Sequence, residues 1–288
     1  MEKKFKDQNR KAKEIKGSQI IKYIISFILI LYTCIALYLL LSTFLNSFKT
    51  KQDLVNNILG FPKEFILNNY STILFDEGFL KYFKNSILLV SMGLFFLISC
   101  ASLAAYGIAQ YDFKRKAALQ TYFMIGLMFP IQLGILPLFI ILSKLHLNNT
   151  LLGLALVYAA NLSFPLLVFT NFFKAIPVSV LESARIDGAG EFLIFAKIAL
   201  PISKPVFFTM GIINFVAIWN DFYLPLVFLT KTNVRTLTLS IYSYMSNFLK
   251  NWSLIFAAVS VALIPIIIIY FIFSKQIVAG LTGGAVKE

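Results

Sequence analysis

The stretch ESARIDGAG, residues 182–190, interrupts a strongly apolar chain with three charged residues and two glycines. Ser179 and Glu182 fit the Ser-x-x-Glu capping box, in which two side chains satisfy free N–H groups at the start of a helix. Gly188 suits the left-handed conformation that commonly ends a helix, and Glu191 suits the first turn of the next one. The stretch therefore predicts a short helix, a sharp glycine turn and a second helix.

Two prolines bound this hairpin within the segment 176–204, which is too polar to cross a membrane. Pro177 cannot extend the preceding helix, and Pro201 is expected to end the second one. One interpretation is an amphipathic hairpin that lies on lipid headgroups, with Arg185 and Lys197 facing phosphates. The other is a docking element for a cytoplasmic partner, because a compact hairpin joined to two spans can transmit motion across the membrane. The residues alone leave both interpretations open.

The rest of the chain has the composition of a membrane protein. Of its 288 residues 59% are hydrophobic and 14% are charged, too few charges to cover a soluble domain of this length. A helix needs about 20 apolar residues to cross the hydrocarbon core, and lipid forces each such run to be helical because it offers backbone groups no partner. We therefore expect an all-α fold, a polytopic transmembrane helical bundle. Its six predicted spans are residues 20–44, 86–109, 118–142, 151–173, 205–229 and 254–273.

The positive charge follows the predicted topology rather than a nucleic-acid surface. The net charge is +13, and 17 of the 26 Lys and Arg residues fall on one side, with the N-terminal segment, residues 114–116, the 176–204 loop and the C-terminal tail. The positive-inside rule places this side in the cytoplasm. We therefore expect both termini and the ESARIDGAG stretch to be cytoplasmic, and we expect no nucleic-acid partner.

The chain lacks the residues that an energy-converting enzyme needs. A P-loop requires a Gly-Lys pair, and the sequence contains none, so ATP hydrolysis must come from another polypeptide or a gradient must drive the protein. Gradient-driven carriers usually hold ionisable residues within their spans, where a charge costs roughly 2.5–3.5 kcal/mol, and only Asp221 is a clear candidate. His146 is the single histidine, and neither CxxC nor HExxH occurs. We therefore expect no enzymatic activity, and no metal or cofactor in this chain.

Trp219, Asn220 and Asp221 form the second group of interest. Asp221 lies roughly 24 Å beyond Pro205 at 1.5 Å rise per residue, past the middle of the bilayer. An indole beside an amide and a carboxylate can hold a sugar, because the ring face stacks on its apolar side and the polar groups bind its hydroxyls. Alternatively the cluster is structural, with polar groups bonding a neighbouring helix and the indole at the outer interface. The three residues are candidates for the substrate path, and the structural interpretation stays open.

Longer pieces of the chain resemble a known family. ESARIDGAGEFLIFAKIALPISKP, residues 182–205, resembles the EAA loop of ABC-importer permeases, with Ser183 in place of the first Ala of Glu-Ala-Ala. KNSILLV, FPIQLGILPLFIIL, WNDFYLPL and GLTGGAVKE resemble the carbohydrate branch of that family, which includes the second membrane subunit of the maltose transporter. The likeness extends over residues 80–288, in order.

The resemblance implies that the loop is a coupling helix seated in a cleft of an ATPase subunit. Glu182 would face cationic groups there, Ala184 would permit close approach, and Gly188 would permit the turn. Asp187 would either contact the ATPase or bond the helix end. The similar tail implies a second ATPase contact, at Gly283 and Gly284. The implied coupling residues are Glu182, Ser183, Ala184, Asp187, Gly188 and Ala189.

The implied function is that of a permease subunit in an ATP-driven sugar importer of a bacterial cell (inner or plasma) membrane. The implied partners are a second homologous permease in a heterodimer, two ATPase subunits that bind ATP-Mg, an extracytoplasmic sugar-binding protein and membrane lipid. Permeases for phosphodiesters, polyamines or amino acids are alternatives, and a gradient-driven carrier is a less favoured one. His146 and the outer loop 232–251 either meet the binding protein or are plain solvated loops.

The expected organisation follows from the spans and the loop. The ATPase contact is expected within residues 179–201. The predicted parts are a cytoplasmic N-terminal segment (1–19), a first span (20–45), an extracytoplasmic loop (46–80), a permease core (81–275) with the coupling loop 176–204, and a cytoplasmic tail (276–288).

Overall fold

The computed structural model describes the backbone of residues 2–245 and 251–283, and the side chains of residues 19–245 and 251–274 among them. The regular elements within these ranges are all helices, which confirms the predicted all-α class. The chain divides into two compact units, which are described separately: Met1–Ser71 with Asn251–Ser260, and Thr72–Lys250 with Val261–Glu288. The long helix α15 (Trp252–Gly283) contributes to both units.

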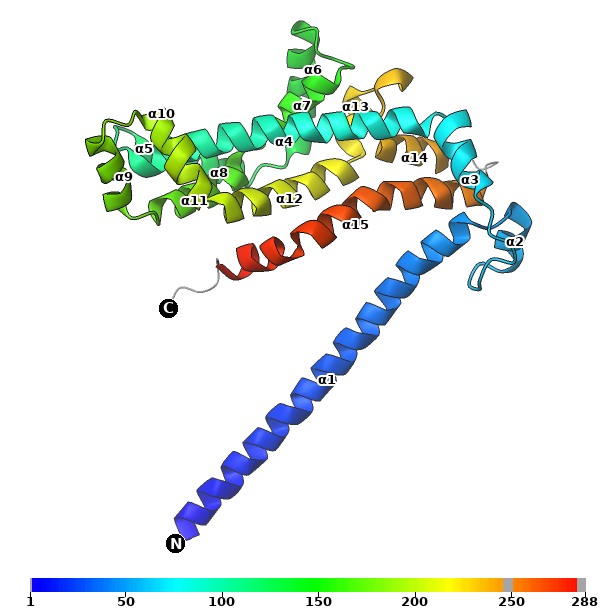
Figure 1. The fold of residues 1–288 in the computed structure, drawn as a ribbon, viewed down its shortest axis with the longest axis horizontal. Coiled ribbons are helices and arrows are strands. Elements are labelled where there is room, and N and C mark those ends of the chain that lie inside the picture. The colour runs from blue at the N-terminus through cyan, green and yellow to red at the C-terminus, as the bar shows by residue number, and fades with distance from the viewer. Residues whose placement is uncertain (1, 246–250, 284–288) are drawn as a thin grey trace. The chain divides into compact units, whose positions relative to one another are not determined.

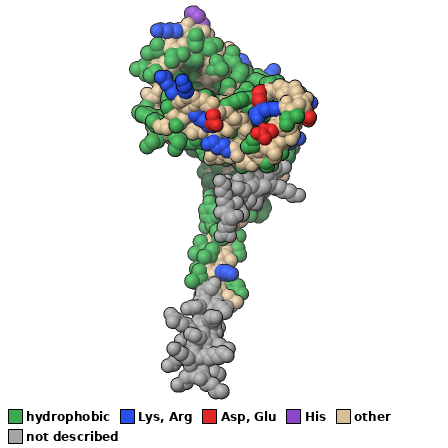
Figure 2. Space-filling view, turned by 90° about the vertical axis from the view of Figure 1, so that its left-hand side faces the viewer, with side chains coloured by type: hydrophobic (Ala, Val, Ile, Leu, Met, Phe, Trp, Pro, Cys, Tyr) green, Lys and Arg blue, Asp and Glu red, His purple; other side chains and the backbone are tan. Residues whose placement is uncertain are grey.

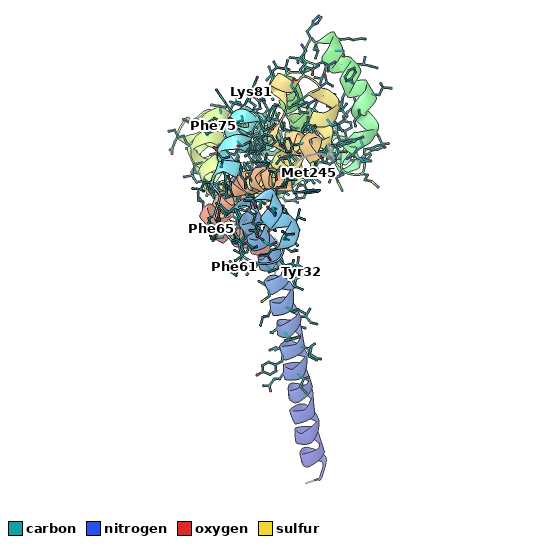
Figure 3. The ribbon with its side chains drawn as sticks, turned by 90° about the vertical axis from the view of Figure 1, so that its right-hand side faces the viewer. Tyr32, Phe61, Phe65, Phe75, Lys81 and Met245 are labelled. Carbon is teal, nitrogen blue, oxygen red and sulfur yellow. The ribbon has the colours of Figure 1, made fainter. Side chains whose placement is uncertain are left out.

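Unit 1 contains one very long helix and two short ones. These are α1 (Glu2–Ser47), α2 (Lys51–Asn56) and α3 (Asn68–Ser71). The segment between α2 and α3 carries large aromatic side chains on its surface, and Phe61 and Phe65 are 76% and 66% exposed (Figure 3).

Buried polar groups help to order the segment that follows α1. Lys49 is fully buried, and its Nζ donates hydrogen bonds to the carbonyl oxygens of Asn57 and Gly60 at 2.5 and 2.7 Å. Asn69 Nδ2 donates to two further carbonyls, at 2.8 and 2.9 Å. These bonds satisfy backbone groups that burial would otherwise leave unpaired. This part of the predicted loop 46–80 is therefore a folded segment.

Unit 2 is organised around α4 (Phe79–Gln110), which packs against α7 (Leu151–Ala160), α8 (Ser163–Lys174) and α12 (Lys204–Asn220). Its other helices are α5 (Lys116–Gly126), α6 (Ile135–Lys144), α9 (Val178–Ile186), α10 (Glu191–Ile194), α11 (Leu200–Ile202), α13 (Tyr223–Phe228) and α14 (Leu237–Met245). Single turns of 3-10 helix occupy Ile131–Gly134 and Thr232–Val234, and π-helical turns occupy Thr72–Asp76 and Phe195–Ala199. Figure 1 shows α9 and α10 near the Gln110 end of α4, and α14 near the opposite end.

The helices account for the predicted number of membrane spans. Three helices are long and apolar enough to cross alone: Gln19–Ser47, Phe79–Gln110 and Trp252–Ser274. Three bent pairs also qualify: Lys116–Gly126 with Ile131–Lys144 (96°), Leu151–Ala160 with Ser163–Lys174 (52°), and Glu191–Ile202 with Lys204–Asn220 (77°). Counting each pair as one span yields up to six. In the pair that forms the fifth span, only Lys204–Asn220 overlaps the predicted span 205–229, while Glu191–Ile202 belongs to the predicted loop 176–204.

The third, fourth and fifth spans differ from the straight helices that we expected. Pro130 lies between the two pieces of the third span, Pro165 in the first turn of α8, and Pro225 in the first turn of α13. A proline has no N–H to donate to the carbonyl four residues earlier, so a helix cannot continue through it undisturbed. The fifth span therefore ends at Asn220 instead of residue 229.

Candidate functional site

The first helix of the hairpin, α9, begins at Val178 and not at the predicted capping box. Pro177 occupies the N-cap position, and no side chain caps the helix. Ser179 lies within the first turn, where its carbonyl oxygen accepts a hydrogen bond from Ser183 Oγ at 2.8 Å. The predicted capping box of Ser179 and Glu182 is therefore wrong, because the proline, with its fixed φ and missing N–H, starts the helix instead.

The turn at Gly188 confirms the predicted end of this helix. Gly188 has a φ of +82°, its N–H donates to the carbonyl of Arg185, and the N–H of Ala189 donates to the carbonyl of Ala184, both at 3.0 Å. These two bonds form a Schellman motif, which pairs carbonyls that the helix end would leave free. Ala184 and Ala189 both pack against the apolar core. The two alanines thus support the turn from its inner side.

The second helix of the hairpin runs one residue further than predicted. It begins at Glu191, as expected, and passes through the π-helical turn Phe195–Ala199 to Ile202. Pro201 is the second residue of α11, which directly follows this π-helical turn. The bend then falls at Ser203, directly before α12.

The inner face of the hairpin belongs to the core of unit 2. Leu181 on α9 is fully buried, and Ile194 on α10 is 1% exposed. They share one buried cluster with residues of α4 and α8, namely Ala101, Ala105, Ile108, Leu166, Phe169 and Phe173. An interfacial helix needs its apolar face free to enter the lipid. The packing therefore favours a hairpin held by its own helix bundle over one that lies on headgroups.

A polar contact, here called the Glu191 joint, links the two helices of the hairpin to each other and to α4. It consists of Arg185, Glu191 and Tyr106. Arg185 Nε donates to Glu191 Oε1 at 2.8 Å, and the Tyr106 hydroxyl donates to Glu191 Oε2 at 3.4 Å. The hydrogen bond from Arg185 is the main cause that lowers the pKa of Glu191. Partial burial, with the nearby Glu191 carboxylate, raises the pKa of Tyr111 at the end of α4 to about 12. Arg185 therefore binds Glu191, where the lipid interpretation had it facing phosphates.

The outer face of the hairpin is exposed and combines acidic with large apolar side chains. Ile186 is 85% exposed and Phe192 is 75% exposed. Ile186 is not among the residues that the sequence singled out as candidates for the contact. The hairpin end of unit 2 also carries Lys, Arg, Asp and Glu side chains (Figure 2). Four of the six implied coupling residues are exposed on this face: Glu182, Ser183, Asp187 and Gly188.

Trp219 is enclosed by the protein. Its side chain is 2% exposed, and its Nε1 donates to the carbonyl of Ala262 at 3.0 Å. The indole stacks on Phe215, with ring centroids 5.7 Å apart and planes at 12°, and meets Phe83 edge-on. Since both the N–H and a ring face are engaged, the structure favours the structural interpretation for this residue, with the indole packed inside the protein instead of at the outer interface.

Asp221 connects two of the interrupted spans. Its Oδ2 accepts a hydrogen bond from the Tyr158 hydroxyl of α7 at 2.7 Å, and its Oδ1 accepts from the N–H of Tyr223 at 2.8 Å. The second bond satisfies a free donor at the start of α13. Asn220 is exposed, unlike its two neighbours. A role in the substrate path stays a prediction for Asn220 and Asp221.

Comparison with known proteins identifies the family. Residues 97–283, more than half of the chain, match the family described as "Binding-protein-dependent transport system inner membrane component". The chain belongs to this family. It is a membrane protein, the permease component of such a transport system.

Relatives of this permease match along most of its length. It is 30% identical to the "Probable starch degradation products transport system permease protein AmyC" of Thermoanaerobacterium thermosulfurigenes, over 93% of this chain and 97% of that protein. It is 36% identical to the "Multiple sugar-binding transport system permease protein MsmG" of Streptococcus mutans, over 86% and 91%. A chain of a bacterial ABC transporter for import of the polysaccharide alginate has the same fold, with a TM-score of 0.80 and 20% identity over 90% of this chain and 97% of that one.

The permease's predicted outer contacts are only partly within the described residues. The loop 232–251 contains α14, and Leu237 and Leu239 of that helix are buried, so most of it is packed and not a solvated loop. Residues 246–250 lie outside the described part. His146 is exposed in the turn between α6 and α7. At the tail, Gly283 is the last residue of α15, and Gly284 lies outside the described residues.

Proposed function

We propose that this permease imports a sugar or oligosaccharide, as one of two homologous membrane subunits of an ATP-driven importer. Both named relatives belong to carbohydrate transport systems by their names, and this chain matches them along most of its length. An extracytoplasmic sugar-binding protein would deliver the substrate. Two partner ATPase subunits would bind ATP-Mg, because this chain has no Gly-Lys pair with which to build a P-loop.

The two-faced hairpin is the observation that carries the coupling part of this proposal. Its outer face presents Glu182, Ile186 and Asp187 to a partner, while its inner face is buried against α4 and α8. A charged rim around a large apolar side chain is the composition of a docking patch. A fully packed inner face transmits displacement, since protein interiors are close-packed and yield little. Movement of an ATPase subunit against Ile186 would thus move α4, α8 and, through Ser203, α12.

The hydrogen bonds of Asp221 support an ATP-driven cycle of alternating access in place of a gradient-driven one. The candidate path residue Asp221 is bonded to Tyr158 and Tyr223, and is thus held in place structurally. A carrier that works by proton or sodium binding would need intramembrane ionisable groups free to titrate or to coordinate. We therefore assign the energy input to the hairpin and the opening of the path to the bent spans that it joins.

Uptake by the assembled transporter tests this proposal. The permease would be purified with the subunits that accompany it, reconstituted in liposomes with ATP inside and supplied with its binding protein outside. We expect ATP-dependent uptake of an oligosaccharide, such as a maltooligosaccharide, which is a product of starch degradation. A glycerophosphodiester, a polyamine and an amino acid serve as comparison substrates. Uptake of one of those three in place of every oligosaccharide would refute the substrate class, and uptake without ATP would refute the coupling.

A further inference from the structure

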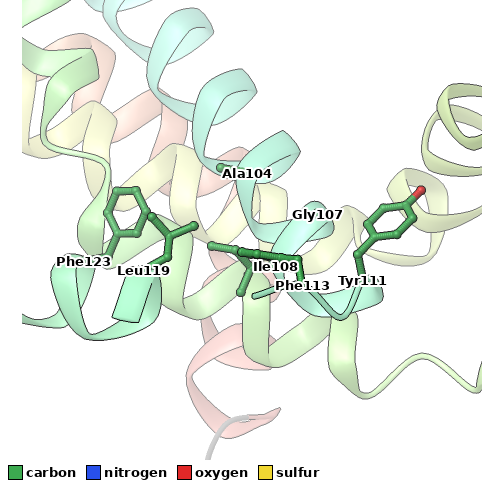
Figure 4. A pocket seen from close by; sticks show the side chains of 7 residues that line it. All are labelled: Ala104, Gly107, Ile108, Tyr111, Phe113, Leu119 and Phe123. Atoms are coloured by element: carbon green, nitrogen blue, oxygen red, sulfur yellow. The ribbon is translucent and has the colours of Figure 1, made fainter. Parts of the chain in front are cut away.

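A groove of about 450 Å³ lies where α4 ends and α5 begins (Figure 4). Ala104, Gly107 and Ile108 of α4 form one wall, Leu119 and Phe123 of α5 form another, and Phe113 lies between them. Figure 4 shows the hydroxyl of Tyr111, at the rim, pointing away from the other lining side chains. The walls thus offer a ligand hydrocarbon contacts and almost no hydrogen-bonding groups.

The groove has open space against α4. A Cβ atom added to Gly107 would meet no heavy atom within 4 Å. Its size lies in the range of about 300–1,000 Å³ that is usual for ligand pockets in proteins. Along α4 it extends from Ala104 to Tyr111, about 10 Å at 1.5 Å rise per residue. That length fits within one leaflet, which is half of a hydrocarbon core about 30 Å thick.

Three cations follow the lining residue Phe113 where the loop after α4 leads into α5. They are Lys114, Arg115 and Lys116. Lys116 Nζ is engaged, because it donates to the Tyr111 carbonyl at 2.9 Å and to Asp112 Oδ1 at 3.0 Å. Lys114 and Arg115 are exposed, and neither side chain makes a hydrogen bond or ion pair with the residues whose side chains are described. The loop beside the groove therefore offers two exposed cations to an anion.

We propose that this groove binds one acyl chain of an anionic phospholipid, with the lipid phosphate against Lys114 and Arg115. Apolar walls within leaflet depth select a hydrocarbon chain over a polar solute, which would lose its hydrogen bonds there. Basic groups at a groove between spans select an anionic headgroup over a zwitterionic one. The two features are adjacent, so one lipid molecule satisfies both.

Lipid titration by native mass spectrometry tests the site on the full chain, purified with the subunits that accompany it. The probes are phosphatidylglycerol and phosphatidylcholine with identical acyl chains. We expect one site that prefers phosphatidylglycerol. Each cation near the membrane surface raises the affinity for an anionic lipid about five-fold. The double variant Lys114→Gln with Arg115→Gln should therefore bind phosphatidylglycerol about 25-fold more weakly and no longer prefer it to phosphatidylcholine. Gly107→Leu should lower the affinity for both lipids alike, because it fills the space for the chain.

Matched variants control for charge and for side-chain volume. Lys144→Gln with Lys231→Gln removes two exposed cations that lie far from the groove in the sequence, and Gly211→Leu adds the same side chain at another helix glycine with open space around it. Both controls should bind phosphatidylglycerol like the unmodified protein. Equal binding by controls and groove variants would overturn the proposal.

A photo-reactive phenylalanine analogue in place of Phe113 provides the second measurement, which does not depend on folding of Gly107→Leu. An adduct with a lipid supports the site, whereas an adduct with another protein chain means that a helix fills the groove and overturns it.

Discussion

At the scale of single residues, Gly188 is the position where backbone geometry leaves least choice. Its φ of +82° lies in the left-handed region, while no heavy atom of the chain lies within 4 Å of an added Cβ. Any cost of a side chain within this chain therefore comes from the backbone, at about 1–2 kcal/mol for an L residue. In the docked state the same side chain would also occupy the partner surface.

Gly188→Val should lower the free energy of unfolding by about 1–2 kcal/mol and abolish retention of the ATPase subunit. Gly190→Val is the matched control. Gly190 has a φ of −68° and a ψ of 154°, an extended conformation that valine adopts readily, and it too has open space around an added Cβ. Thermal unfolding and co-purification of the ATPase would be measured for both variants. Wild-type behaviour of Gly188→Val in both measurements would remove the hairpin from the coupling mechanism.

The Glu191 joint predicts a defined dependence on pH. The side chains of Arg185 and Glu191 are 35% and 42% exposed. Because water screens an ion pair at this exposure, the pair contributes about 1 kcal/mol or less to the free energy of unfolding. The pKa of Glu191 is lowered from 4.5, so the contribution is present above that value and is lost as the pH falls through the lower folded pKa. Glu191→Gln should thus cost a small amount of stability from pH 5 to pH 8, and the difference from the wild type should shrink below pH 4.5.

Glu182→Gln is the control for this prediction. It removes an exposed carboxylate that makes no hydrogen bond or ion pair with the described side chains, and its stability should not differ from that of the wild type in this way. Equal pH profiles for Glu191→Gln and the wild type would mean that the ion pair adds nothing to stability.

At the scale of elements, α9 has a buried face that packs on the bundle and an exposed face to which we assign the proposed docking. Ile186→Asp should leave the unfolding free energy within about 0.5 kcal/mol, because the side chain is 85% exposed. It should nevertheless abolish ATPase binding, since the apolar centre of the docking patch would become charged. Val178→Asp, at a 58% exposed site on the first turn of the same helix, is the control and should keep the ATPase. If both variants bind the ATPase equally well, Ile186 is not part of the contact.

Substitution of Leu181 should lower stability and leave ATPase binding intact, the reverse of the result expected for Ile186. It is fully buried between the hairpin and the bundle, so Leu181→Ala should cost about 2–5 kcal/mol of unfolding free energy. The outer face would remain chemically intact, and ATPase binding should persist at temperatures where the variant stays folded. Loss of ATPase binding by the folded variant would mean that the inner packing also sets the docking geometry.

These elements show which features of the site the sequence could predict. The helix end at Gly188 was predictable because the left-handed turn is a local property of one glycine. The start of α9 was not, because Pro177 and the capping box of Ser179 are both plausible starts, and local propensity does not decide between them. The Glu191 joint was beyond prediction, since Tyr106 and Glu191 are 85 residues apart and meet only through the packing of α4 against the hairpin. The prediction of continuous third, fourth and fifth spans was wrong because it rested on the length of each apolar run. Run length measures hydrophobicity and takes no account of a proline that interrupts the helix.

At the scale of the whole molecule, run length and charge predict the topology that the coupling argument needs. Six spans would place the two ends of the chain on one side, and the 17 of 26 Lys and Arg residues predict that this side is cytoplasmic. This topology predicts that the hairpin is cytoplasmic and that the loop 46–80 is extracytoplasmic. Docking of a cytoplasmic ATPase at Ile186 is consistent only with this orientation.

Labelling with a membrane-impermeant thiol reagent tests the orientation in intact cells. Cys34 and Cys100, the two free cysteines, would first be replaced by alanine. Lys51→Cys, at an exposed site just after α1, should react from outside, whereas Ser183→Cys, on the exposed face of α9, should react only after the membrane is permeabilised. Both positions are exposed, so unequal reactivity reports the side of the membrane and not burial. The reverse pattern would place the hairpin outside the cell, where no ATPase can reach it, and would refute the coupling mechanism together with the topology.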